Sequence, residues 1–175
     1  MYQQIARFGQ LPFSKAFLFR VGFNLSPMYR RSCGRVIEVS PDLLQVKIRL
    51  RHSYKNKNYV GSIFGGSLFS SVDPFPMVQL INIIEEDFIV WDKEAKIQFW
   101  KPAFEDLYAT FSYTEEELEE LRQRVKKEKE IEIVKSTPLT NKAGDKVFCV
   151  VDKTLFIAEK KHFKAKRAKK AAAEK

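Results

Sequence analysis

Residues 58–84, NYVGSIFGGSLFSSVDPFPMVQLINII, form a long apolar stretch that carries one formal charge, on Asp73. Apolar surface of this extent has to be covered by the rest of the chain, which places the stretch at the centre of the fold. An ionised carboxylate in apolar surroundings is costly unless it is paired or well hydrogen-bonded. Asp73 therefore caps a helix, lies at a water-exposed break, or takes part in chemistry.

The residues next to Asp73 favour the first of these alternatives. Asp73 followed by Pro74 fits a helix N-cap with proline at the first helical position. Pro74 also disfavours helical geometry at Asp73, and Pro74 and Pro76 each remove one backbone donor. Local spacing alone thus predicts a structural cap in preference to a catalytic acid, while both remain open.

Strand patterns flank the apolar stretch on both sides. Residues 34–39 and 43–50 predict two strands joined by a turn, because Val46, Ile48 and Leu50 alternate with polar residues. Further strands are predicted at residues 88–100, 107–113, 131–135 and 147–158. Residues 114–130 predict an exposed helix that opens with a capping box of Thr114 and Glu117. The pattern is α+β: an antiparallel sheet wrapped around a central hydrophobic helix.

The two ends of the chain differ from this middle part. Residues 1–32 are predicted to form a helical segment packed on the domain, with Ser14 as a cap; a membrane-surface helix is the alternative. Residues 33–158 make up the main domain. Residues 159–175 hold eight Lys/Arg and two Glu, so this tail supplies +6 of the net charge of +9. We expect the tail to be disordered.

Charge and cysteine content exclude several classes of function. The body of the chain is close to neutral, so no specific nucleic-acid partner is expected, although the tail leaves weak contact with anionic membrane open. Cys33 and Cys149 are far apart and lack a CxxC spacing, which argues against a zinc or redox motif. We therefore expect no metal, no cofactor and a cytoplasmic location.

The segment GSIFGGSLFSSVD (residues 61–73) resembles the central-helix motif of hotdog-fold acyl-CoA thioesterases, in particular the phenylacetyl-CoA thioesterase-like branch and an uncharacterised branch near it. Asn58 matches an Asn of that motif, Gly65 and Gly66 match its glycine pair, and Asp73 matches its acid, seven residues after Gly66. The segment KIQFWKP (residues 96–102) resembles the strand that follows. The resemblance covers roughly residues 34–158 and implies a hotdog fold, with the N-terminal helix and the helix inserted between strands as additions.

The resemblance also implies a function. Such a protein hydrolyses an acyl-CoA or acyl-carrier thioester, with the Gly65–Gly66 helix start polarising the carbonyl. Asp73 of a neighbouring subunit would act as general base or nucleophile, and Asn58 would orient water or substrate. The resemblance places the acyl group against three further residues: Phe64, Ser67 and Phe69. It implies a homodimer or a dimer of dimers, without cofactor or metal.

Two residues depart from the family pattern. Phe64 stands where the family has a histidine, which removes a polar group near the thioester, and Pro74 directly follows the acid. These differences leave a second hypothesis open, a hotdog protein that binds acyl groups or assembles without catalysis.

Overall fold

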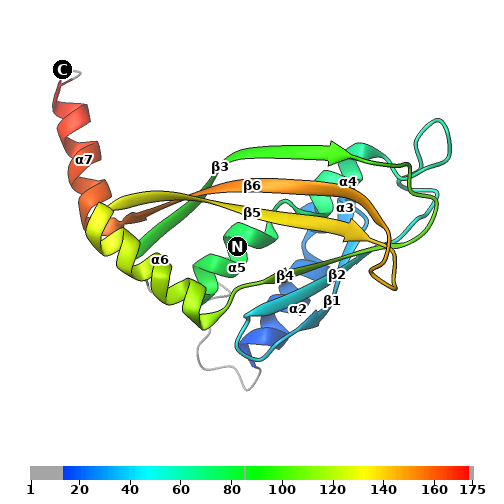
Figure 1. Cartoon of the computed structure of the whole chain (residues 1–175), viewed down its shortest axis with the longest axis horizontal. Helices are drawn as coiled ribbons and strands as arrows, with labels where there is room; N and C mark the ends of the chain where they lie inside the picture. Colours follow the sequence, from blue (N-terminus) through cyan, green and yellow to red (C-terminus); the bar gives the residue numbers. More distant parts are fainter. Residues whose placement is uncertain (1–13, 85, 174–175) are drawn as a thin grey trace.

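A six-stranded antiparallel sheet, with strand order β1-β2-β4-β5-β6-β3, forms the frame of the molecule (Figure 1). The computed structural model describes residues 14–84 and 86–173. The elements in chain order are α2 (Lys15–Leu25), α3 (Pro27–Arg31), β1 (Gly34–Val39), β2 (Gln45–Leu50), α4 (Gly65–Val72), α5 (Phe75–Ile83), β3 (Phe88–Phe99), β4 (Leu107–Ser112), α6 (Glu115–Glu128), β5 (Glu130–Thr140), β6 (Val147–Glu159) and α7 (Lys160–Ala173).

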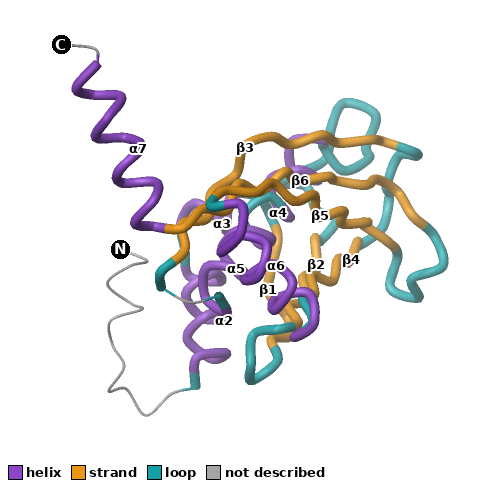
Figure 2. Tube along the Cα trace, turned by 60° about the vertical axis from the view of Figure 1, so that its left-hand side comes forward, coloured by secondary structure: helices purple, strands orange, loops and turns teal. Residues whose placement is uncertain are grey.

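The predicted α+β architecture is confirmed, since the curved sheet encloses α4 and α5 (Figures 1 and 2). Alternation explains the strands: Val46, Ile48 and Leu50 of β2 are fully buried, while their neighbours in sequence are not. On the helix side, Phe75 of α5 stacks on Phe111 of β4, with ring centroids 4.7 Å apart. The part of the apolar stretch that forms α4 and α5 is thus the centre of the fold, whereas Tyr59, Val60 and Phe64 before it are exposed.

The central helix is broken in two at Asp73 and Pro74, and the predicted N-cap at Asp73 is wrong. Asp73 has right-handed helical dihedrals (φ −46°, ψ −48°) and is the C-cap residue of α4, with its N–H bonded to Phe69 O at 3.0 Å. The preference of a residue before proline for extended geometry is modest. It is overridden here because Phe75 has to reach the core, where it is fully buried.

The N-terminal helix α2 begins at its predicted cap, where Ser14 Oγ accepts from Phe17 N at 3.2 Å. Its buried residues Phe19 and Phe23 contact Phe75, with the Phe23 and Phe75 rings stacked 4.7 Å apart. Residues 1–13 of the predicted N-terminal segment lie outside the described residues. None of the described helices is long and apolar enough to cross a membrane.

The expectation of a disordered tail is wrong over Lys160–Ala173, which form α7. Alanine and lysine are good helix formers, and the first turns have contacts to hold them. Phe163 packs edge-on against Trp91, and Lys166 forms an ion pair with Glu130. From this base the helix extends away from the sheet (Figures 1 and 2).

Strand β3 contains an irregularity that sets its inner face. Asp92 pairs with Leu155 and Glu94 with Thr154, so Lys93 is an extra residue in the ladder, a β-bulge. Successive side chains of a strand alternate between the two faces of the sheet. One extra residue therefore moves every later side chain of the strand to the opposite face. Asp92 before the bulge and Phe99 after it therefore both face the central helices.

Candidate functional site

The start of α4 is held in place by backbone hydrogen bonds to two loops. Ile63 N donates to Ala103 O at 2.8 Å, and Phe64 N donates to Asn56 O at 2.8 Å. Phe64 is the N-cap residue and gives no side-chain cap. The first N–H groups of a helix, those of Gly65 and Gly66 here, have no acceptor within it and carry partial positive charge.

Two aromatic rings explain why this helix start consists of glycines. A Cβ added to Gly66 would lie 2.3 Å from the Phe64 ring, and one added to Gly65 would lie 3.0 Å from the Phe99 ring. Both rings are more than half exposed, 56% for Phe64 and 58% for Phe99. The helix N-terminus therefore opens between two apolar side chains that solvent can reach.

Asp73 pairs with a buried lysine. Lys153 Nζ on β6 lies 2.5 Å from Asp73 Oδ1 and 3.1 Å from Asp92 Oδ2 on β3. The lysine side chain is 4% exposed, whereas that of Asp73 is 38% exposed. A buried ammonium needs a counter-charge within reach, and Asp73 supplies one. The ion pair therefore fixes one side of the Asp73 side chain, while its other side is turned to solvent.

Asp92 occupies the less polar end of this cluster. Burial raises the pKa of Asp92 above its ordinary value of 3.8, and the hydrogen bond and charge of Lys153 oppose that rise in part. Its Oδ1 is buried and has no hydrogen-bond partner among the described residues. Asp92 is thus an acid that binds a proton more readily than an exposed aspartate does.

The structure gives the remaining predicted residues different surroundings. Asn58 holds its own loop: its Oδ1 accepts from Val60 N and Ser62 N, each at 3.1 Å, and its Nδ2 donates to Ser62 Oγ at 2.8 Å. Ser67 is buried in the first turn of α4. The Phe69 ring, one turn before Asp73, lies 5.7 Å from Lys153 Nζ. Phe69 therefore adjoins the Asp73 cluster, and Asn58 has its described partners within residues 58–62.

Lys153 and Asp92 were not among the residues that the sequence motifs indicated. One signal for Lys153 was present. In the alternating pattern of β6 it has the same parity as Val151 and Leu155, which are both fully buried, so its side chain points to the core. A lysine that points to the core needs a counter-charge. Asp92 gave no comparable signal, because its inward orientation depends on the register of the β3–β6 pairing and on the bulge at Lys93.

The two halves of the predicted catalytic site are far apart within one chain. Asp73 follows Gly65 by eight residues of helix, which corresponds to about 12 Å of rise. A thioester carbonyl held at the glycine amides is therefore out of reach of the Asp73 carboxylate of the same chain.

Among the described residues, no group of three or more His, Cys, Asp or Glu side chains is arranged to hold a metal ion. The cluster of Asp73, Lys153 and Asp92 has a different composition. It combines a solvent-facing carboxylate with a buried cation and a second carboxyl group of raised pKa.

Solved structures of similar fold come from several bacteria. A Pseudomonas aeruginosa protein of unknown function, described as a probable thioesterase, has a TM-score of 0.72 at 20% identity, covering 82% of this chain and 95% of its own. A Chlorobaculum tepidum protein of unknown function has a TM-score of 0.64 at 15% identity, covering 82% and 96%. A Haemophilus influenzae thioesterase has a TM-score of 0.59 at 11% identity, covering 83% and 91%.

These similarities confirm the predicted fold, which is the hotdog fold. No curated protein is detectably similar in sequence. Residues 13–156, most of the chain, match a protein family known as Domain of unknown function (DUF4442). This protein is therefore a hotdog-fold member of the DUF4442 family.

Proposed function

We propose that this protein is a thioesterase that hydrolyses an acyl-CoA or acyl-carrier thioester. The observation that carries the proposal is the position of Asp73. It lies seven residues after Gly66, at the break between α4 and α5, and pairs with the buried Lys153 while one side remains open to solvent. Solved structures of the same fold that are described as thioesterases support this class of reaction.

In the proposed reaction, the thioester carbonyl oxygen accepts hydrogen bonds from the Gly65 and Gly66 N–H groups, which stabilise the negative charge that develops on it. The Asp73 carboxylate takes a proton from water as the water oxygen attacks the carbonyl carbon. The C–S bond then breaks, and the departing thiolate receives that proton. Direct attack by Asp73, followed by hydrolysis of the resulting anhydride, is the nucleophilic variant of the same step.

A homodimer would complete the site, because about 12 Å separates the two halves within one chain. Strand β3 is the last strand of the sheet as far as the described residues show, so its outer edge could pair with a second copy. Exposed aromatic side chains lie at the end of this strand and just after it: Phe99, Trp100 and Phe104. The exposed strand edge and these rings support assembly on this side, either as a dimer or as a dimer of dimers.

Phe64 and Phe99 favour an apolar acyl group. Their rings cover the glycine helix start and are exposed in the single chain. A thioester bound there would bury apolar ring surface, which favours binding by about 25 cal/mol per Å². A phenylalanine instead of a histidine at position 64 leaves the carbonyl to the backbone N–H groups alone.

Steady-state hydrolysis across a panel of acyl-CoA thioesters tests the proposal. Asp73→Asn should lower kcat by about 100-fold or more on any substrate that the unmodified protein turns over. Asp145→Asn, in the exposed turn before β6, is the matched control and should leave kcat unchanged. Absence of turnover on every thioester, or an unchanged kcat for Asp73→Asn, would refute the proposal.

A second candidate function is acyl-group binding without catalysis. The observation in its favour is the ion pair, because Lys153 already donates to Asp73 Oδ1 and so occupies one of the two oxygens that could accept a proton from water. In that case acyl-CoA would raise the melting temperature, and the thiol would not be released. Melting and thiol release measured on the same samples separate the two functions.

A further inference from the structure

Helix α2 is held to the body of the protein by one of its faces. Phe19 and Phe23 are buried on that face. The Asn24 side chain bonds to both backbone groups of Val36 in β1, each at 2.9 Å. These contacts fix which side of the helix is turned outward, and Figure 2 shows α2 at the periphery of the molecule.

The outward side of α2 is apolar as well. Phe17, Val21 and Leu25 follow one another at a spacing of four residues, so they form one stripe on the side opposite the two buried phenylalanines. Phe17 is 46% exposed and Leu25 is 66% exposed. Three residues after Leu25, Met28 of α3 is 54% exposed. An exposed apolar patch of this kind, rimmed by polar residues, is typical of an interaction surface.

The charged side chains of α2, α3 and the first half of β1 are all basic. They are Lys15, Arg20, Arg30, Arg31 and Arg35, all exposed, and none forms an ion pair with another of the described residues. The first acidic residue of the chain is Glu38. This surface therefore combines exposed apolar side chains with positive charge that no described carboxylate neutralises.

The combination distinguishes between classes of partner. A second copy docked through the same face of a two-fold dimer would place like charges against one another, which disfavours self-association here. A nucleic acid would neutralise the charges but leave the apolar stripe in water. An anionic bilayer meets both needs, because its phosphates attract Lys and Arg while its interfacial region takes up apolar side chains.

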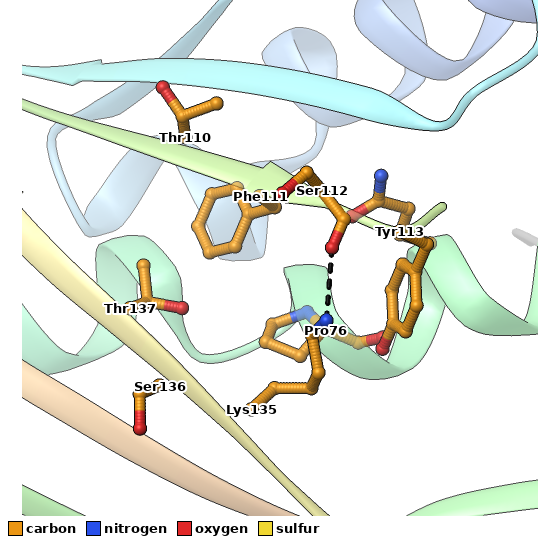
Figure 3. A pocket seen from close by; sticks show the side chains of 9 residues that line it. Pro76, Thr110, Phe111, Ser112, Tyr113, Lys135, Ser136 and Thr137 are labelled. Carbon is orange, nitrogen blue, oxygen red and sulfur yellow. Dashed lines mark hydrogen bonds between the residues drawn. The ribbon is translucent and has the colours of Figure 1, made fainter. Parts of the chain in front are cut away.

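The cavity between β4 and β5 does not offer a lipid chain an alternative place (Figure 3). Its volume of about 70 Å³ has room for about five to seven water-sized atoms, at roughly 10–15 Å³ each. Lys135 reaches across the opening from β5, and its Nζ donates to Ser112 O at 3.0 Å. Contact of this chain with lipid is therefore a matter of its outer surface.

Helix α7 is also basic, but it differs from α2 in its apolar content. Its one large apolar side chain, Phe163, packs against Trp91. The exposed residues of α7 are Lys, Arg and Ala. This helix can attract an anionic surface, but it brings no apolar stripe to insert into one.

We propose that α2 and α3 form a docking surface for an anionic membrane. Phe17, Val21 and Leu25 lie among the lipid headgroups, and the surrounding Lys and Arg side chains contact lipid phosphates. The helix lies along the membrane surface and does not cross it. This docking is independent of the thioesterase hypothesis, because it involves none of the residues proposed for hydrolysis.

Co-sedimentation of the full chain with lipid vesicles tests the docking surface. Vesicles of phosphatidylcholine alone are compared with vesicles in which about one lipid in three is phosphatidylglycerol. We expect binding to the anionic vesicles only. Leu25→Ser combined with Met28→Ser should weaken this binding about tenfold or more, because it removes apolar surface that inserts. Tyr54→Ser combined with Val134→Ser, which removes exposed apolar side chains elsewhere, should leave it unchanged.

Charge variants test the electrostatic part in the same assay. Arg20→Gln combined with Arg30→Gln should weaken binding to the anionic vesicles about tenfold, because each basic side chain near the surface adds to the attraction. Lys142→Gln combined with Lys146→Gln, in the exposed turn before β6, is the matched control and should have little effect.

A polarity-sensitive fluorophore attached to Leu25→Cys reports whether the stripe enters the lipid. The background carries Cys33→Ser, and Cys149 is buried, so the label has a single accessible thiol. Its emission should shift to the blue when anionic vesicles are added. The same label on Tyr54→Cys should not respond.

Four outcomes would overturn the proposal. A Leu25→Cys label that reports an apolar environment before lipid is added would mean that another segment or a second copy covers the stripe. An unchanged label on protein that sediments with vesicles would place the contact elsewhere. Loss of binding in Lys164→Gln combined with Arg167→Gln, but not in the α2 variants, would assign the contact to α7. Binding to duplex DNA but not to vesicles would identify a nucleic acid as the partner.

Discussion

Lys153 Nζ lies 2.5 Å from Asp73 Oδ1, which ties the break in the central helix to the middle of β6. The same ammonium lies 3.1 Å from Asp92 Oδ2, so a single buried cation links α4, β3 and β6. Only the Asp73 carboxylate in this cluster is more than one-third exposed. The arrangement fixes the position of Asp73 while leaving it accessible, and it would do so in a catalytic or in a purely structural role.

Lys153→Met should destabilise the fold by about 2–4 kcal/mol. The variant removes the cation and leaves two partly buried carboxylates facing each other. Equilibrium unfolding in urea measures the loss. Lys96→Met, on the exposed face of β3, is the matched control and should change stability by less than about 0.5 kcal/mol. Equal losses in the two variants would show that the ion pair adds nothing to stability.

Asp92 should give the protein a recognisable pH dependence. The folded-state pKa of Asp92 is raised, mainly by burial, so folding favours the protonated acid. Its stabilising contribution is complete below the ordinary value of 3.8 and is lost as the pH rises through the folded-state pKa. Asp92→Asn does not titrate, so the stability of the unmodified protein relative to this variant should fall across that acidic window.

Unfolding free energies of both proteins, measured at a series of acidic pH values, give this difference directly. Asp145→Asn provides the reference for an exposed aspartate and should show no comparable trend. If the unfolding free energy of the unmodified protein, relative to that of Asp92→Asn, increased with pH, the Lys153 ion pair, and not burial, would dominate the titration of Asp92.

Gly66→Ala should impair hydrolysis or binding at the helix start while leaving the stability of the fold nearly unchanged. The added Cβ meets the Phe64 ring at 2.3 Å, but this ring is more than half exposed and can turn away. Alanine also favours a helix relative to glycine, so we expect stability to change by less than about 1 kcal/mol. Thioester hydrolysis or acyl-CoA binding should still weaken at least tenfold, because the ring and the Cβ then crowd the helix start.

Phe64→Ala combined with Gly66→Ala provides the corresponding control, since it removes the clash. If Gly66→Ala alone caused a large loss of unfolding free energy, Gly66 would be required for packing and not for access to the helix N-terminus.

The two cysteines should differ sharply in reactivity. Burial raises the pKa of the Cys149 thiol to about 12, and the residue is fully buried in the sheet. Cys33 is only partly buried. A chromogenic disulfide reagent at neutral pH should therefore label one thiol of the native protein rapidly and the second only on unfolding. Cys33→Ser should abolish the rapid phase, and a rapid phase that persists would contradict the burial of Cys149.

Local sequence patterns predicted most of the elements correctly. The alternation in β2 and the Ser14 cap of α2 are where the sequence indicated. Thr114 caps α6 through Glu117 N at 3.1 Å, although the Glu117 carboxylate binds Lys135 instead of completing the capping box. These features were predictable because each depends on residues within about one turn of one another.

Errors arose where distant residues decided the outcome. Strand β5 runs over Glu130–Thr140, well beyond the predicted residues 131–135, because β6 offers it a partner along this length. The tail forms a helix, and its base is held by contacts with β3 and β5. Asp73 is a helical residue paired with Lys153, eighty positions away in the sequence.

The sequence by itself indicated that the apolar stretch at residues 58–84 must be largely covered by the rest of the chain, because burial of apolar surface is favourable. It also determined that Asp73 needs a partner, because an unpaired charge is costly in such surroundings. Only the tertiary structure decided that this partner is Lys153. Strand register and a bulge at Lys93 set which side chains face inward, and both depend on pairing between strands far apart in the chain.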